Sequence, residues 1–215
     1  MAELTFQERP AAGEPHGLLI LHHGRGTNEH DLLPLAEALD PQRRLHVVSP
    51  RAPLRLPPSP GYHWYGVRRV GYPDPDTFHA SRSLLGALHD ELWERSGLTP
   101  ERTVLGGFSM GTVMSYALGL AGDRPRPAGI LAFSGFIPTV DGWEPDLAAR
   151  AGMPVLIAHG RGDPVIDVEF ARRARQLLEA AGLDVDYGES DVPHTIDPAD
   201  IPRATAWLDE AFAVS

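Results

Sequence analysis

Five short apolar runs recur along the chain, and each predicts a strand that is covered on both faces. They are rich in valine, leucine and isoleucine, show no regular alternation with polar residues, and lie at 18–23, 45–50, 103–108, 129–134 and 154–159. Continuous apolar runs of this length are typical of parallel strands buried between two layers. Two other runs, 4–8 and 185–189, alternate apolar and polar residues and predict edge strands.

Amphipathic segments of helical length separate these runs. They lie at 29–40, 76–97, directly after Ser109, 168–182 and 199–213. Strands that alternate with helices form a parallel sheet, because each right-handed crossover places a helix over one of its faces. The pattern predicts a three-layer α/β fold, with a mostly parallel central sheet and helices on both faces.

The overall composition narrows the class of protein. The 215 residues suit one domain, 1–215, with no repeat or linker, and the absence of cysteine excludes disulfides and thiolate metal sites. A net charge of −10 disfavours binding to nucleic acid or to anionic membranes. Since the N-terminus lacks the pattern of a secretory signal and no apolar run approaches the length of a membrane span, we predict a cytoplasmic protein with no membrane association.

One serine stands where an apolar run gives way to a helical pattern. Ser109 lies in Gly107-Phe108-Ser109-Met110-Gly111, a G-x-S-x-G sequence between the run 103–108 and the next amphipathic segment. A nucleophilic serine occupies such a sharp strand-to-helix turn, and glycines two residues before and after it keep the crowded backbone free of side chains. A helix N-cap would explain the serine but not both glycines. We therefore expect Ser109 to be a nucleophile.

A serine nucleophile needs a histidine base and an acid that orients the base. Where the serine occupies a turn of this kind, the acid and then the histidine follow it later in the chain. Asp163 follows the run 154–159 in a glycine-rich loop, at the same edge of the sheet as Ser109. His194 is the one histidine beyond it. We expect these residues to complete a catalytic triad. The rival acids are Asp167, Asp184, Asp186 and Asp191.

The remaining histidines have simpler interpretations. We place His89 with His16, His30 and His79 in solvent, and His46 and His159 as residues of strands. His22 and His23 are adjacent on a strand and point to opposite faces, which disfavours a metal site, and no metal is expected. The turn that follows them, with Gly24, Arg25 and Gly26, leaves its backbone accessible. The N–H groups of Arg25 and Met110 are therefore expected to form an oxyanion hole.

Residues 50–76 show neither the pattern of a strand nor that of an amphipathic helix, and they contain seven prolines in 27 residues. Proline at this density blocks helices and central strands, so we expect a loop near the active site. Its aromatic residues include Trp64 and Tyr65. The sequence leaves two roles open for these two rings: contact with a substrate, or attachment of the loop to the core.

Taken together, these motifs resemble the phospholipase/carboxylesterase family of small α/β-hydrolases. The resemblance covers nearly the whole chain and includes the H-G-x-G turn, the Trp-Tyr pair, G-F-S-M-G, H-G-x-x-D-P-V and D-x-P-H. It implies a carboxylesterase that cleaves small-molecule carboxylic esters or thioesters without a cofactor, and homodimers occur in the family. Arg25 and Met110 stand where many members have leucine and glutamine. Alternatives are a non-catalytic ligand-binding protein on this scaffold, a dienelactone-hydrolase-like enzyme or a peptidase.

Overall fold

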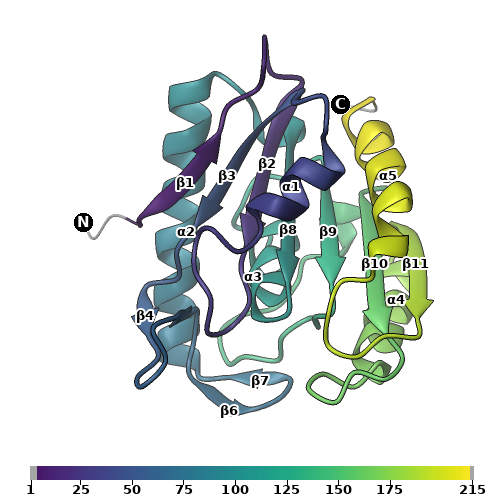
Figure 1. Ribbon diagram of the computed structural model, residues 1–215. Helices are drawn as coiled ribbons and strands as arrows, with labels where there is room; N and C mark the ends of the chain where they lie inside the picture. The colour runs from purple at the N-terminus through teal and green to yellow at the C-terminus, as the bar shows by residue number, and fades with distance from the viewer. Residues whose placement is uncertain (1–3, 214–215) are drawn as a thin grey trace.

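The computed structural model describes residues 4–213, and a seven-stranded sheet runs through its centre (Figure 1). Its strands are β1 (Phe6–Arg9), β2 (Gly17–His22), β3 (Leu45–Pro50), β8 (Thr103–Phe108), β9 (Gly129–Phe133), β10 (Pro154–Gly160) and β11 (Asp184–Ser190). The spatial order is β1-β3-β2-β8-β9-β10-β11. Only β1 runs antiparallel to its neighbour in this sheet. The mostly parallel α/β fold is confirmed, and the two alternating runs form its edges.

Helices cover both faces of the sheet. In Figure 1, α1 (Leu33–Leu39) and α5 (Ile201–Ala213) lie in front of it, and α2 (Pro75–Ser96), α3 (Met110–Gly119) and α4 (Glu169–Ala180) lie behind. Short 3-10 helices lie at Pro100–Arg102, Ala148–Arg150 and Pro198–Asp200. Within residues 4–213, none of the helices is both long enough and apolar enough to cross a membrane.

The central strands supply both hydrophobic cores, because successive side chains point to opposite faces. On β2, Leu18 and Ile20 pack in the core that α2, α3 and α4 cover, whereas Leu19 and Leu21 pack in the core under α1 and α5. All four side chains are fully buried. This two-sided burial explains why the strand shows no alternation in the sequence.

Two predictions of local structure need correction. The segment 50–76 is not wholly irregular: it holds two short antiparallel pairs, β4 (Leu54–Arg55) with β5 (Tyr62–His63), and β6 (Val67–Arg69) with β7 (Tyr72–Pro73). Pairs this short need few N–H donors, so they tolerate prolines beside them and, at Pro73, within a strand. The first helix begins at Leu33 rather than 29, because Pro34 suits its first turn and the preceding residues form turns.

The placement of His89 in solvent is wrong. α2 buries His89 to 1% exposure, and its ring stacks on His22 at 5.7 Å between centroids. The Nε2 atom of each ring is buried without a hydrogen-bond partner among the described residues. Burial lowers the pKa of His89 to about 3 and that of His22 well below its ordinary value, so both rings are neutral.

Candidate active site

Ser109 occupies the sharp turn between β8 and α3. Its backbone has φ 57° and ψ −119°, a conformation that residues other than glycine rarely adopt. Its N–H donates to the Phe133 carbonyl at 2.9 Å. A Cβ atom on Gly111 would lie 1.8 Å from the His22 carbonyl oxygen, and one on Gly107 would lie 2.5 Å from the Gly111 carbonyl carbon. A side chain at either position would collide with backbone atoms that cannot move aside, so both positions require glycine.

The structure brings Ser109, His194 and Asp163 together from the carboxyl ends of three strands. The Nε2 atom of His194 lies 2.8 Å from the Ser109 hydroxyl oxygen, and its Nδ1 lies 2.6 Å from Oδ2 of Asp163. Asp163 follows β10 and His194 follows β11. The His194 side chain is 17% exposed, whereas that of Asp163 is fully buried. The imidazole can therefore be reached from solvent, while the Asp163 carboxylate is shielded from it.

Hydrogen bonds keep the Asp163 carboxylate ionised despite its burial. Burial opposes its charged form, but hydrogen bonds from His194 and from the backbone outweigh this and lower its pKa. Its Oδ1 accepts the N–H groups of Val165 and Ile166 at 2.8 and 2.9 Å. The rival acids have other partners: Asp167 accepts from the Glu169 N–H, Asp186 from Arg203 and Asp191 from Arg161, and Asp184 is exposed.

The turn after β2 is held by the His23 ring. Because Nε2 of His23 accepts the Ala52 N–H at 3.0 Å, the proton lies on Nδ1, which donates to the Gly24 carbonyl at 2.7 Å. Burial lowers the pKa of His23 and favours this neutral form. Arg25, the next residue, is exposed in this turn. Met110 begins α3, where the first N–H groups have no partner within the helix.

Trp64 ties the two sides of this expected oxyanion hole together. Its indole Nε1–H donates to the His23 carbonyl at 2.9 Å, and its backbone N–H lies 3.3 Å from the Met110 sulfur. Trp64 is 0% exposed and Tyr65 is 3% exposed. Of the two roles considered for these rings, attachment of the loop to the core fits this burial, and direct contact with a substrate stays a prediction.

A groove of about 1110 Å³, which no pattern in the sequence predicted, begins next to Gly135, a residue that packs on the strand-to-helix turn 107–111, called the elbow below. Its walls are β7, the segment 136–145 and α4, with Phe136, Trp143 and Leu177 among the apolar residues. The neighbouring Gly135 packs on the elbow, since a Cβ there would lie 3.1 Å from the Ser109 carbonyl oxygen. None of the three triad residues lines the groove itself. In the sequence, the apolar residues after the run 129–134 were the one indication of this groove.

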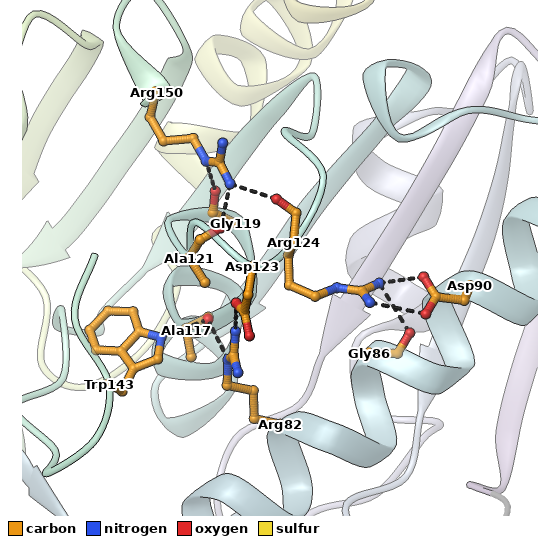
Figure 2. Close-up of polar contacts among 10 residues, drawn as sticks. All are labelled: Arg82, Gly86, Asp90, Ala117, Gly119, Ala121, Asp123, Arg124, Trp143 and Arg150. Carbon is orange, nitrogen blue, oxygen red and sulfur yellow. Dashed lines mark hydrogen bonds and ion pairs between the residues drawn. The ribbon is translucent and has the colours of Figure 1, made fainter. Parts of the chain in front are cut away.

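The far end of α3 is capped by a buried arginine. Figure 2 shows the Arg150 guanidinium aimed at the carbonyl oxygens of Gly119, Ala121 and Arg124. The donor–acceptor distances to Gly119 and Arg124 are both 2.8 Å, and Arg150 is 4% exposed. A cation at a helix C-terminus offsets the partial negative charge of the last carbonyl groups. Arg150 therefore anchors the helix whose first turn follows Ser109.

His159 also belongs to this neighbourhood, although the sequence indicated only a strand residue. Its Nε2 donates to the Ile166 carbonyl at 2.8 Å and lies 3.3 Å from Oδ2 of Asp163. The signal was present in the sequence, since His159 stands at the end of a strand, four residues before the expected acid.

The α/β fold, with a serine at a strand-to-helix turn and a histidine and an acid supplied after later strands, defines the class of α/β-hydrolases. Within this class, the chain belongs to the phospholipase/carboxylesterase family, whose model matches residues 8–210. It is 30% identical to acyl-protein thioesterase 1 of Gibberella zeae, over 92% of each chain.

Two solved structures have the same fold along nearly the whole chain. A Bacillus cereus carboxylesterase superposes with a TM-score of 0.85 at 25% identity, covering 98% of this chain and 95% of its own. Esterase PE8 superposes with a TM-score of 0.83 at 30% identity, covering 98% and 100%. The protein is a hydrolase of the esterase or thioesterase type.

Proposed function

We propose that this protein is a carboxylesterase that cleaves small-molecule esters of small or medium acyl chains through an acyl-serine intermediate on Ser109. The observation that carries the proposal is the unbroken chain of contacts from the Ser109 hydroxyl to His194 at 2.8 Å and from His194 to Asp163 at 2.6 Å. A serine hydroxyl becomes nucleophilic when a base within hydrogen-bond reach accepts its proton.

In the first step, the Ser109 oxygen attacks the carbonyl carbon of the substrate while Nε2 of His194 takes the hydroxyl proton. Asp163 accepts the Nδ1–H of the resulting imidazolium and stabilises its charge. The negative oxygen of the tetrahedral intermediate faces the N–H groups of Met110 and Arg25, each worth about 3 kcal/mol of the barrier. His194 then passes its proton to the leaving oxygen or sulfur, and the alcohol or thiol departs.

In the second step, water hydrolyses the acyl-enzyme. His194 takes a proton from the water as its oxygen attacks the acyl carbon, and returns that proton to the Ser109 oxygen as the acid leaves. The enzyme is thus restored without a cofactor, and the chemistry is the same for an ester and for a thioester. The thioesterase and esterases that resemble this chain support both substrate classes.

Hydrolysis of p-nitrophenyl acetate and butyrate by Ser109→Ala tests the proposal. We expect kcat to fall by at least about 10³-fold, because the nucleophile is lost while the fold remains. Ser83→Ala, at an exposed position on α2, is the matched control and keeps wild-type activity. Full activity of Ser109→Ala would show that the assignment is wrong.

A fluorophosphonate distinguishes an enzyme from a non-catalytic binding protein. We expect it to label the wild type and not Ser109→Ala, because it reacts with an activated serine. A wild-type protein that binds small esters and stays unlabelled would instead support the binding protein. Esters and thioesters that share one acyl chain then determine the preferred leaving group.

The proposal includes three further points on partners and location. We place the enzyme in the cytoplasm, without nucleic acid or membrane partners, and as a homodimer. Cell fractionation and light scattering after size-exclusion chromatography test the location and the oligomeric state.

A further inference from the structure

His159 faces the catalytic acid from inside the protein. It lies on β10, its side chain is fully buried, and its Nε2 is 3.3 Å from Oδ2 of Asp163. We propose that His159 is a positioning residue for the hydrolysis: as a neutral hydrogen-bond donor to the Ile166 carbonyl, it fixes the peptide unit that holds the Asp163 carboxylate against His194. This inference rests on the proposed triad.

The contacts of the imidazole ring assign its protonation. Nε2 carries a hydrogen, because it faces the Ile166 carbonyl at 2.8 Å, and a carbonyl can only accept. Nδ1 is buried and has no hydrogen-bond partner among residues 4–213. A second proton would therefore create a buried N–H group without an acceptor, which costs free energy. Burial likewise lowers the pKa of His159.

The charged and titratable groups around His159 come from three places in the fold. Asp163 lies in the loop after β10, His194 lies in the loop after β11, and Glu189 lies on β11 itself. Glu189 is paired with Arg172 at 2.8 Å. Asp163 and Glu189 favour a protonated His159, but its burial prevails, so the ring acts as a dipole and not as a charge.

His159 acts on Asp163 by two routes. The first passes through one peptide unit, because the Ile166 N–H donates to Oδ1 of Asp163 while the Ile166 carbonyl accepts from His159. The second is electrostatic, since the His159 Nε2 lies 3.3 Å from Oδ2 while its hydrogen is directed at the Ile166 carbonyl, so the ring places the positive end of its dipole near the carboxylate. A neutral donor holds the carboxylate in place and leaves its negative charge available to the imidazolium. A cation at the same position would cancel that charge.

Two substitutions at one position separate positioning from packing. His159→Phe keeps a planar ring but removes the donor, and His159→Gln keeps an amide N–H that can donate to the Ile166 carbonyl. His46→Phe is the matched control, because His46 is also a strand histidine whose pKa burial lowers, and it lies on β3, away from β10 in the sheet. kcat, KM and the pH profile of kcat/KM on p-nitrophenyl butyrate are measured for each.

For His159→Phe we expect kcat to fall by about 10- to 100-fold with KM within about twofold, as a misplaced catalytic group causes. The acid limb of its kcat/KM profile shifts to higher pH, because a carboxylate that has lost the nearby dipole of His159 holds the imidazolium more strongly. His159→Gln recovers most of kcat and the wild-type profile, and His46→Phe keeps both. A wild-type pH profile in His159→Phe overturns the inference, whether or not kcat falls.

Nitrogen NMR of the wild-type histidines tests the proposal even where His159→Phe does not fold. We expect His159 to remain in the neutral Nε2–H form across the range in which activity rises with pH. Protonation within that range, or the Nδ1–H form, overturns the inference. Ser109→Ala separates this failure from failure of the proposed function: if it is inactive and His159→Phe behaves as wild type, only the role of His159 is lost.

Discussion

The buried Arg150 at the C-terminal end of α3 allows a quantitative test of the structure. Replacing Arg150 with methionine removes the donors that its guanidinium directs at the carbonyl groups of Gly119, Ala121 and Arg124 (Figure 2). Methionine fills much of the same space but cannot donate a hydrogen bond. The change therefore isolates the loss of polar partners at the end of α3.

The size of the effect follows from the number of carbonyl groups left without their donor. Each hydrogen bond to a charged donor contributes about 1.5–3 kcal/mol, although three bonds from one side chain do not add fully. Three such bonds that add only in part amount to about 3–5 kcal/mol in total. We expect Arg150→Met to lower the free energy of unfolding by this amount, a large part of the total for a protein domain.

Urea unfolding at neutral pH, followed by circular dichroism, measures this loss. Arg126→Met is the matched control, because Arg126 also donates to a carbonyl, that of Ala151 at 3.2 Å, but is exposed. We expect the control to change stability by less than about 0.5 kcal/mol. A loss below about 1 kcal/mol for Arg150→Met would show that the three carbonyl groups do not depend on this arginine.

Three other predictions concern the elbow, the buried histidines and the acid. Gly111→Ala places a methyl group against the His22 carbonyl and should cost about 3 kcal/mol or more, whereas Gly13→Ala, with open space around it, should be nearly neutral in the same unfolding assay. Since burial lowers the pKa of His89 to about 3, only the unfolded state gains its proton as pH falls below about 6.5. His89 therefore lowers the free energy of unfolding by about 1.4 kcal/mol for each unit by which the pH falls. Unfolding measured between about pH 6 and 4 should show that His89→Leu removes this part of the slope. An unchanged slope would contradict the burial of a neutral ring. Asp163→Asn should lower kcat on p-nitrophenyl butyrate by about 10⁴-fold with little change in KM, and a loss below about tenfold would argue against its role as the acid.

The features that the sequence predicted well are those with local causes. A strand buried on both faces must be apolar along its length, and a serine at a crowded turn must be flanked by glycines. For this reason the strands, the elbow and the edge of the sheet that holds Ser109, Asp163 and His194 could be inferred from short stretches. The expected order along the chain, serine, then acid, then histidine, identified which three residues meet there.

The features that the sequence did not reveal depend on contacts between distant segments. Arg150 donates to carbonyl groups 26 to 31 positions away, and backbone acceptors leave no trace in the sequence. The groove exists only because the segment 136–145 lies beside α4. His89 is different, since it shares one helical face with Leu85, Leu88 and Leu92, and this periodicity would have placed it in the core.

The position of β11 at the edge of the sheet ties catalysis to the completion of folding. His194, the proposed base, follows this strand, which within residues 4–213 pairs with β10 alone, and lies against a serine 85 positions earlier in the chain. Under the proposed mechanism, a molecule whose outer strand has detached would retain the turn at Ser109 and most of its sheet, yet would lack the base that accepts the serine proton. If His194 is the base, recovery of activity during refolding marks the docking of this edge strand.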